Sequence, residues 1–333
     1  MNKKAIVTGC AGFIGSHLTD SLLASGWEVI GVDNLSTGLR RNVPSLRPDF
    51  EFFEMDVGTM AATGRLLYEM QNADVVYHLA ALGSVPRSIE EPVAAHSSNV
   101  NAFVGLLESA RLLKTRPRIV FASSSSVYGD CPRIMKRESD SGTALSPYAA
   151  TKQAMEIYAR VFAQTYGLNI VGLRYFNVFG PRQRPDSAYA AVIPAWSAAM
   201  LRGAPVMING QGQHKRDFTP VADVVRATRA AGTCLMDAGV CRIFNVGCGR
   251  LVSLQELFVA LSEITGYKRD PFIGFPRPGD VFESGADTTL LEHALGFKPD
   301  GSQETFKMRL KEVIDWMRGY EPAPIAKVAG DIH

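Results

Sequence analysis

Residues 5–15 read AIVTGCAGFIG, an apolar start followed by three glycines spaced three apart. The first three residues predict a short buried strand, and a helix is expected from about 12 to 25. Gly9, Gly12 and Gly15 thus fall between a strand and a helix, the context in which such a turn holds a dinucleotide. Glycine lets the backbone approach a pyrophosphate, and the helix N-terminus supplies amide groups and a positive dipole.

An acidic residue, Asp33, follows the next expected strand, 27–32. In this position a carboxylate accepts hydrogen bonds from the adenosine ribose and repels a 2′-phosphate, so NAD is favoured over NADP. The alternative role for Asp33 is a simple loop cap. Asp56 ends the third expected strand, and two roles remain open for it: hydrogen bonding to the adenine amino group, or capping a turn.

Tyr148 and Lys152 are four residues apart in the run SPYAATK, which starts at Ser146. A helix places residues four apart on one face, so the lysine ammonium lies beside the phenol. A nearby positive charge favours the phenolate, and we therefore expect a lowered pKa for Tyr148. Such a tyrosine is a general acid/base. The spacing alone also occurs by chance, but its place behind the glycine turn favours a catalytic role.

Composition is ordinary for a soluble globular protein, with 46% apolar and 20% charged residues in a chain of 333. The formal net charge of +2 gives no sign of nucleic-acid binding. The five cysteines are odd in number and lack Cys-x-x-Cys spacing, which predicts reduced thiols and no metal site. No run is long enough for a membrane span, and we expect a cytoplasmic protein.

Strands and helices alternate through the first half of the chain, which predicts an α/β fold with a Rossmann-type, doubly wound parallel sheet. Strands are expected at 5–7, 27–32, 50–55, 75–79, 119–122 and 169–174, and helices near 12–25, 59–70, 97–113 and 147–166. Ligands of such sheets bind off the carboxyl ends of the strands, where the unusual residues cluster. We expect an NAD-binding domain at 1–180 and a smaller mixed α/β substrate lobe at 181–333, with a soft boundary that the chain can cross again. Helices of the lobe are expected near 188–203, 220–237, 253–265 and 302–320.

These motifs resemble the extended short-chain dehydrogenase/reductase family and, within it, the UDP-sugar 4-epimerases. The resemblance covers nearly the whole chain. It runs in order through 9–15, 33–38, 56–57, 78–81, 123–129, Tyr148 and Lys152, 173–180, 216–218 and 277–280.

The resemblance implies a catalytic trio of Ser124, Tyr148 and Lys152. Ser124 then binds the sugar hydroxyl at carbon 4, Tyr148 takes its proton, and Lys152 holds the nicotinamide ribose. Hydride passes to NAD, the resulting 4-keto sugar turns over, and the hydride returns to its other face. The implied cofactor-binding residues are Gly9, Gly12, Phe13, Ile14, Gly15, Asp33, Asn34, Ser36, Thr37, Gly38, Asp56, Val57, Leu79, Ala80, Ala81, Asn99, Tyr148, Lys152 and Tyr175.

The substrate site follows from the same resemblance. Asn177, Arg216 and Arg277 resemble the ligands of the UDP diphosphate, and cationic forks suit phosphate oxygens. Asp280 resembles the acid that holds the uridine ribose. Each of these residues by itself would equally fit a surface ion pair. The other implied substrate residues are Gly83, Ser84, Ser124, Ser125, Ser126, Tyr148, Val192, Trp196, Met207, Asn209 and Ser284.

The hexose is predicted from Ser284, four positions after Asp280. Glucose-restricted relatives carry a tyrosine there, whereas relatives that admit N-acetylhexosamines carry a small residue. The runs 83–88 and 188–196 also resemble the N-acetylated subgroup, so we expect interconversion of UDP-N-acetylglucosamine and UDP-N-acetylgalactosamine. Related 4,6-dehydratases have Asp-Glu at the positions of Ser125 and Ser126, and related UDP-glucuronate decarboxylases use a Glu in that loop. Ser125 and Ser126 carry no ionisable acid, so epimerisation is favoured over both reactions.

Three departures from the family pattern are present, of which the first concerns stacking on the uracil and the other two leave other hexoses, including uronic acids, open. Met207 replaces an aromatic residue, Phe282-Glu283 replaces Arg-His, and 213–215 replaces a more acidic-polar run. The alternatives are a UDP-glucose or UDP-glucuronate 4-epimerase and, in another class, a non-catalytic NAD sensor. The family resemblance suggests a homodimer through the helices at 97–113 and 147–166. From the residues alone, burial of these helices under the second lobe is equally plausible.

Overall fold

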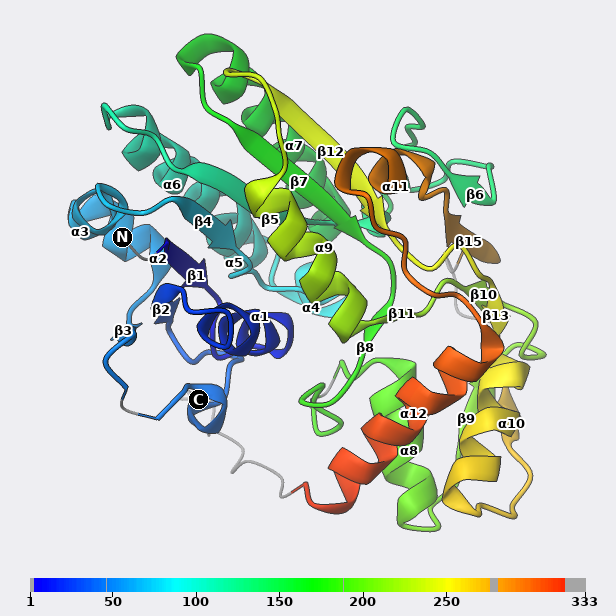
Figure 1. The fold of residues 1–333 in the computed structure, drawn as a ribbon. Coiled ribbons are helices and arrows are strands. Elements are labelled where there is room, and N and C mark those ends of the chain that lie inside the picture. Colours follow the sequence, from blue (N-terminus) through cyan, green and yellow to red (C-terminus); the bar gives the residue numbers. More distant parts are fainter. Residues whose placement is uncertain (1–2, 46, 188, 276–280, 321–333) are drawn as a thin grey trace, which may run out of the picture.

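A computed structural model describes residues 3–45, 47–187, 189–275 and 281–320. Its centre is a seven-stranded parallel sheet with the order β12-β7-β5-β4-β1-β2-β3 (Figure 1). The strands are β1 (Lys4–Thr8), β2 (Glu28–Asp33), β3 (Phe50–Glu54), β4 (Val75–His78), β5 (Arg118–Ser124), β7 (Ile170–Tyr175) and β12 (Cys241–Val246). The predicted α/β fold with a doubly wound parallel sheet is confirmed.

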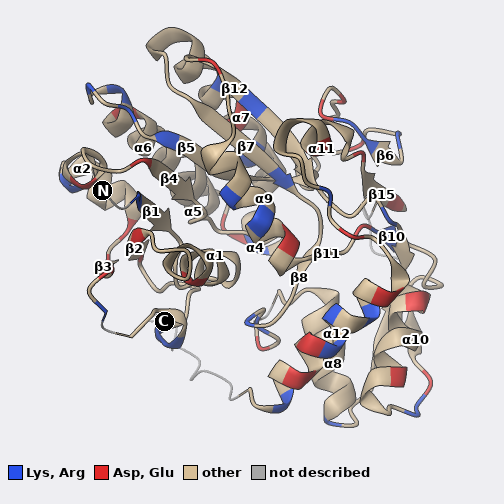
Figure 2. Cartoon of the chain, viewed as in Figure 1, with Lys and Arg blue, Asp and Glu red and all other residues tan. Residues whose placement is uncertain are grey.

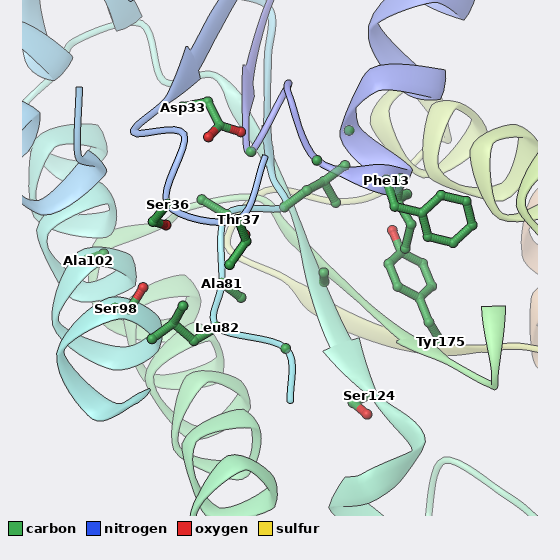
Figure 3. A pocket seen from close by; sticks show the side chains of 18 of the residues that line it. Phe13, Asp33, Ser36, Thr37, Ala81, Leu82, Ser98, Ala102, Ser124 and Tyr175 are labelled. Atoms are coloured by element: carbon green, nitrogen blue, oxygen red, sulfur yellow. The ribbon is translucent and has the colours of Figure 1, made fainter. Parts of the chain in front are cut away.

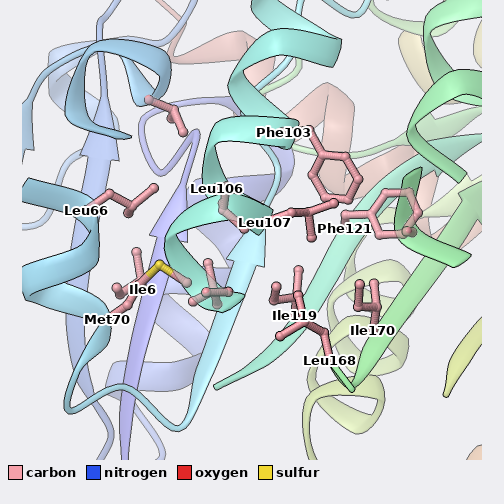
Figure 4. Packing of buried hydrophobic residues seen from close by; sticks show 14 of the residues in the cluster. Ile6, Leu66, Met70, Phe103, Leu106, Leu107, Ile119, Phe121, Leu168 and Ile170 are labelled. Atoms are coloured by element: carbon pink, nitrogen blue, oxygen red, sulfur yellow. The ribbon is translucent and has the colours of Figure 1, made fainter. Parts of the chain in front are cut away.

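Successive side chains of a strand point to opposite faces of the sheet, and helices cover both faces. Ile6 packs on one side, against α2 (Val57–Ala62), α3 (Arg65–Met70), α6 (Ala102–Arg111) and α7 (Pro147–Tyr166). Figure 4 shows Phe103 and Leu107 of α6 lying over Phe121 of β5 in this layer. Ala5 and Val7 pack on the other side, against α1 (Phe13–Leu23), α9 (Val221–Thr233) and α11 (Thr289–Leu295).

The helices that carry the main motifs lie where the sequence predicts them, and two others differ. The expected helix at 59–70 is two helices, because Gly64 adopts a left-handed conformation (φ 73°) between α2 and α3. The expected helix at 97–113 is a π-helical turn, 97–101, followed by α6. Two short helices that the sequence did not predict, α4 (Val85–Glu90) and α5 (Pro92–His96), precede this turn.

The rest of the chain forms a smaller body around a separate core. Its helices are α8 (Val192–Leu201), α10 (Leu254–Thr265) and α12 (Gln303–Arg318). Small sheets join β9 (Met207–Asn209) to β14 (Phe272–Gly274), β8 (Val178–Phe179) to β11 (Thr219–Pro220), and β13 (Val252–Ser253), β10 (Lys215–Arg216), β15 (Glu283–Ala286) and β6 (Met135–Lys136) to one another. The chain returns to the large sheet after residue 180, because β12 pairs with β7.

Charges of both signs are interspersed on α12, whereas the charged residues of α10 are acidic (Figure 2). Within the described ranges, no helix has the length and apolar character needed to cross a membrane. The same ranges contain no group of three or more His, Cys, Asp and Glu side chains placed to hold a metal ion.

Candidate active site

A cavity of about 520 Å³ lies along the carboxyl ends of the central strands. In Figure 3, Asp33, Ser36 and Thr37 lie at one side of it, and Ser124 lies at the end of β5. The predicted residues that line it are Gly9, Gly12, Phe13, Ile14, Gly15, Asp33, Asn34, Ser36, Thr37, Asp56, Val57, Leu79, Ala80, Ala81, Gly83, Ser124, Ser125, Tyr148, Lys152, Tyr175 and Asn177. The fold thus brings most of the expected cofactor residues and all three expected catalytic residues to one cavity.

Glycine occupies the three positions of the turn for different steric reasons. A Cβ on Gly9 would lie 2.7 Å from the Ala80 nitrogen, and one on Gly15 would lie 2.0 Å from the Gly9 oxygen. Both glycines therefore allow the strand, turn and helix to pack closely. A Cβ on Gly12 would come within 4 Å of one atom alone, the Gly9 oxygen at 3.1 Å, and would otherwise project into open space. Gly12 thus keeps the cavity open in front of α1.

The N-terminus of α1 is suited to an anion. Its N-cap residue, Gly12, offers no side-chain acceptor, and the first turn contains no acidic residue. The first amide groups of a helix lack partners within the helix and carry a partial positive charge. The Gly12 nitrogen donates to the Gly9 carbonyl at 3.0 Å, whereas the amides of Phe13 and Ile14, which also line the cavity, are available to a pyrophosphate.

Asp33 is held rigidly at the end of β2. One carboxylate oxygen accepts from the Ala11 nitrogen at 3.0 Å, and the other accepts from the Leu35 nitrogen at 2.8 Å. Burial raises the pKa of Asp33, and these backbone hydrogen bonds oppose the rise. A carboxylate has about four acceptor positions, so capacity remains for ribose hydroxyls.

Asp56 caps a helix, which was one of its two predicted roles. Its side chain accepts from the Gly58 nitrogen at 2.9 Å and the Thr59 nitrogen at 3.3 Å at the start of α2. It also accepts from the side-chain amide of Asn34 at 3.1 Å. Because Asp56 lines the cavity as well, the cap leaves its adenine contact open as an expectation.

The three residues of the predicted catalytic trio meet where β5 ends and α7 begins. Helix α7 starts at Pro147, and the Ser146 hydroxyl caps it by accepting from the Ala149 nitrogen at 3.1 Å. Tyr148 therefore lies in the first turn, and Ser124 lines the same cavity at the end of β5. Lys152 is 1% exposed; its Nζ donates to the Ala122 carbonyl at 2.8 Å and lies 5.8 Å from the centre of the Tyr148 ring.

The predicted lowering of the Tyr148 pKa is wrong for the protein chain by itself. Burial raises the pKa of Tyr148 above its ordinary value, and the hydrogen bond from Ser124 opposes this rise. Burial also lowers the pKa of Lys152 to about 8, so the lysine still carries its charge at pH 7. Loss of water around the phenolate therefore decides the direction in which the pKa of Tyr148 shifts.

A second cavity of about 350 Å³ adjoins the first. Asn177, Val178 and Gln183 line both, so the two cavities meet at the segment that follows β7. The predicted substrate residues that line the second cavity are Asn177, Val192, Trp196, Met207, Asn209 and Arg216. The arrangement suits one elongated ligand that reaches from the catalytic trio to the smaller body.

Comparison with known proteins assigns the family. Residues 5–247 match the model of the NAD dependent epimerase/dehydratase family. The chain belongs to this family. UDP-glucose 4-epimerase of Mycolicibacterium smegmatis is 40% identical over 299 residues, which cover 89% of this chain and 93% of that protein.

Two solved structures from the epimerase/dehydratase family are similar over 95% of this chain. UDP-N-acetylglucosamine 4-epimerase of Methanobrevibacter ruminantium, in complex with UDP-N-acetylmuramic acid, has a TM-score of 0.88, 35% identity and 98% of its chain covered. UDP-glucuronic acid 4-epimerase of Bacillus cereus, with UDP-glucuronic acid and NAD, has a TM-score of 0.84, 31% identity and 99% of its chain covered. The chain is an NAD-dependent enzyme whose relatives are UDP-sugar 4-epimerases, and these relatives differ in their hexose.

The residues present fit the cofactor of the epimerase/dehydratase family. Gly12 leaves room in front of the uncapped α1, and the Asp33 carboxylate lines the same cavity. These residues would hold the pyrophosphate and the adenosine ribose of NAD. The buried ammonium of Lys152 and the Tyr175 ring line the cavity near Ser124. The expected preference for NAD is thus consistent with the donors and acceptors that the chain offers.

Several predicted site residues lie outside both cavity linings. Asn99 is fully buried, and its side chain accepts from the Leu82 nitrogen at 2.8 Å and donates to the Thr151 hydroxyl at 3.0 Å. It therefore holds the loop after β4. Ser84 caps α4 by accepting from the Arg87 nitrogen at 3.2 Å. The others outside are Gly38, Ser126 and Ser284, and Arg277 and Asp280 lie outside the described residues.

The departures from the family pattern at 213–215 and 282–283 are partners of one another. The His214 and Phe282 ring centroids are 5.1 Å apart. The Lys215 ammonium lies 2.9 Å from the Glu283 carboxylate. These residues face each other because β10 and β15 pair in register, which also sets Arg216 beside Ser284. The two unusual runs therefore replace one cross-strand set of contacts with another.

Gln183 and Val178 were missed from the sequence. Both line the junction of the two cavities, and the Gln183 amide donates to the Val178 carbonyl at 3.0 Å. Leu82 and Ser98 in the first cavity and His214 in the second were missed as well. Val178 lies in the motif 173–180 and His214 in the unusual run 213–215, but neither was assigned to the site from the sequence. Gln183, Leu82 and Ser98 belong to no quoted motif, so no local signal distinguishes them from ordinary loop residues.

Proposed function

We propose that the protein is a UDP-N-acetylhexosamine 4-epimerase that interconverts UDP-N-acetylglucosamine and UDP-N-acetylgalactosamine with NAD as its cofactor. The observation that carries the reaction type is the placement of Ser124, Tyr148 and Lys152 together in the first cavity, next to the glycine turn. This cavity joins the second one, lined by Arg216, through Asn177. A sugar at the trio and a diphosphate near Arg216 would occupy the joined cavities.

The side chains of the trio divide the proton transfer between them. Ser124 and Tyr148 hold the hydroxyl at carbon 4, and the Tyr148 oxygen takes its proton and later returns it. Lys152 keeps a positive charge beside the phenol, which favours the phenolate during transfer. When bound, NAD supplies the hydride acceptor and donor, together with a positive charge in the site.

The charges of the lining support an uncharged hexose. Among the described residues that line the first cavity, Lys152 is the single cation, and its ammonium already donates to Ala122. The carboxylate of a uronic acid would lack a counter-ion there, which is costly for a desolvated charge. The small side chain of Ser284, beside Arg216 in the register of β10 and β15, supports room for an acetamido group.

A UDP-glucose 4-epimerase is the second candidate. It is favoured by the 40% identity to the Mycolicibacterium smegmatis UDP-glucose 4-epimerase over 89% of this chain. A UDP-glucuronate 4-epimerase is a third, favoured by the similarity to the Bacillus cereus enzyme.

An assay with purified protein separates these candidates. The protein is incubated with UDP-N-acetylglucosamine, UDP-glucose or UDP-glucuronate, with and without added NAD, and the products that differ at carbon 4 are separated by chromatography. We expect kcat/KM for the N-acetylated sugar to exceed that for UDP-glucuronate by about 100-fold or more, because the desolvated carboxylate stays unpaired. A higher kcat/KM for UDP-glucuronate would refute the hexose assignment while leaving the reaction type intact.

We also propose a homodimer. The sequence suggested an interface through the helices at 97–113 and 147–166, and the exposed apolar side chains favour the second of these, α7, together with α4 and α5 in place of the first. These helices pack against one another and expose apolar side chains: Ile89 is 63% exposed, Val93 77%, Ile157 58% and Val161 50%. For the helix at 147–166, the exposure of Ile157 and Val161 supports a subunit interface over burial under the second lobe. A contiguous apolar surface of this kind is typical of a subunit interface.

The dimer is tested by sedimentation of the wild-type protein and of Val93→Asp. We expect a dimer for the former and a monomer for the latter, because a charge opposite its own copy in a two-fold interface is repelled and desolvated. Leu235→Asp, at a 94% exposed loop residue, is the matched control and remains dimeric. A monomeric wild-type protein contradicts the proposal.

A further inference from the structure

Glu156 is a buried carboxylate on the helix of the catalytic residues, and the proposed chemistry does not use it. It is 3% exposed and follows Lys152 by one helical turn and Tyr148 by two on α7. Residues four apart share one face of a helix. Glu156 therefore extends the row of side chains that α7 directs at the ends of β5 and β7.

Both oxygens of Glu156 accept hydrogen bonds from neighbouring strands. Nε of Arg174, on β7, donates to Oε1 at 2.8 Å, and its Nη2 donates to Oε2 at 2.8 Å. Ser123, on β5, donates its hydroxyl to Oε1 at 2.7 Å. Arg160 adds a bond from Nη2 to Oε2 at 3.1 Å. A bidentate guanidinium pair fixes orientation as well as distance, so α7 is locked to both strands.

Ser123 lines the first cavity itself, and each of the two strand residues that Glu156 holds is next to another residue of that cavity. Ser123 directly precedes Ser124, and Arg174 directly precedes Tyr175. Because the peptide unit between neighbours is rigid, a shift of Ser123 or Arg174 moves the adjacent site residue with it. The contacts of one carboxylate thus couple the catalytic serine to the helix that carries the phenol.

Arg174 is itself braced from the side away from Glu156. Its Nη1 donates to the Glu138 carbonyl at 3.1 Å, and its guanidinium lies 4.7 Å from the Tyr128 ring centre. The Tyr128 hydroxyl donates to Oδ1 of Asn245, on β12, at 2.5 Å. The buried ion pair is therefore part of a network whose members come from separate elements, and such networks restrict the allowed geometries.

We propose that Glu156 and Arg174 form a positioning pair that sets the Ser124 hydroxyl against the Tyr148 phenol. The proposal rests on the proposed 4-epimerase activity and is independent of which hexose is used. Neither residue touches the substrate in this role, so turnover depends on the pair while substrate affinity does not. A misplacement of about 1 Å in a reacting pair lowers the rate by up to about 100-fold.

The test compares Glu156→Gln with a matched control, Glu69→Gln. Glu69 on α3 is also a buried carboxylate, 7% exposed and 2.6 Å from Arg65, and it lies outside both cavity linings. Kinetics use whichever UDP-sugar the wild-type protein converts, and Tm is measured for each variant. We expect Glu156→Gln to lower kcat about 30-fold with KM within about 2-fold, whereas Glu69→Gln keeps the wild-type kcat.

A double-mutant cycle with Ser124→Ala separates positioning from a general structural role. In the Ser124→Ala background the Glu156→Gln change should lower kcat by less than about 3-fold, because the hydroxyl that the pair positions is gone. Its effect on Tm should be the same in both backgrounds. Equal fold-losses of kcat in the two backgrounds, or a KM change as large as the kcat change, would overturn the proposal.

A third variant keeps the test decisive if Glu156→Gln does not fold. Ser123→Ala leaves the ion pair intact and removes only the hydroxyl that ties β5 to Glu156. We expect kcat to fall about 10-fold with KM unchanged, and to fall much less in the Ser124→Ala background. An unchanged kcat in Ser123→Ala refutes the coupling through β5. If the wild-type protein converts no UDP-sugar, the proposed function fails first, and that outcome is distinct from either result.

Discussion

Tyr148→Phe is expected to lower kcat by about 1,000-fold, within the range that removal of a general acid/base produces. The variant keeps the ring but loses the phenolic oxygen that takes and returns the proton in the proposed reaction. Tyr148 is held independently of that oxygen, because its backbone nitrogen donates to the Ser88 hydroxyl at 3.0 Å in the first turn of α7. The fold and the binding of a UDP-sugar should therefore persist while proton transfer stops.

The measurement is steady-state turnover together with calorimetric titration of UDP. The expected result is a Kd for UDP within about 3-fold of the wild-type value, since the loss concerns the transition state and not ground-state binding. Tyr68→Phe makes the same chemical change on the exposed surface of α3 and serves as the control. Turnover of Tyr148→Phe at the wild-type rate would remove Tyr148 from the mechanism.

Ser284→Tyr is expected to lower kcat/KM for UDP-N-acetylglucosamine by about 100-fold and to change that for UDP-glucose by less than about 3-fold. Ser284 on β15 pairs in register with Arg216 on β10, and in-register residues of parallel strands project to the same side of a sheet. Because Arg216 lines the second cavity, a tyrosine at position 284 extends toward the same space and competes with the acetamido group.

Assays with both sugars and a Ser284→Ala control distinguish volume from polarity. Alanine removes the hydroxyl but adds no bulk, so both sugars should retain their wild-type kcat/KM. Loss of both sugars to the same extent in Ser284→Tyr would mean that the substitution disturbs β10 and β15 as a unit. Unchanged turnover of the N-acetylated sugar would mean that residue 284 does not border the hexose.

Local sequence was sufficient for the elements whose boundaries are set by nearby residues. Helix α7 follows its prediction because its start is capped by Ser146 and Pro147, and its end by Gly167 at φ 70°. The prediction of one helix at 59–70 was wrong because the helix breaks at Gly64. Spacing alone does not distinguish a left-handed glycine inside an apolar pattern from a helical one. The prediction for the pKa of Tyr148 was wrong for another reason. Spacing identifies a neighbouring charge but not the loss of water around the phenol.

The sequence by itself predicted the parallel sheet from its alternating strands and helices, and the dinucleotide turn and the Tyr148/Lys152 pair from residues a few positions apart. The role of Ser124 came from the family resemblance and stays a prediction. Tertiary structure alone decided which distant segments meet. It returned β12 to the large sheet, joined two cavities at Asn177 and Gln183, and set the Glu156 carboxylate between β5 and β7. The physical reason is that these contacts arise from the packing of separate elements, where burial and complementary charge choose partners that chain spacing does not record.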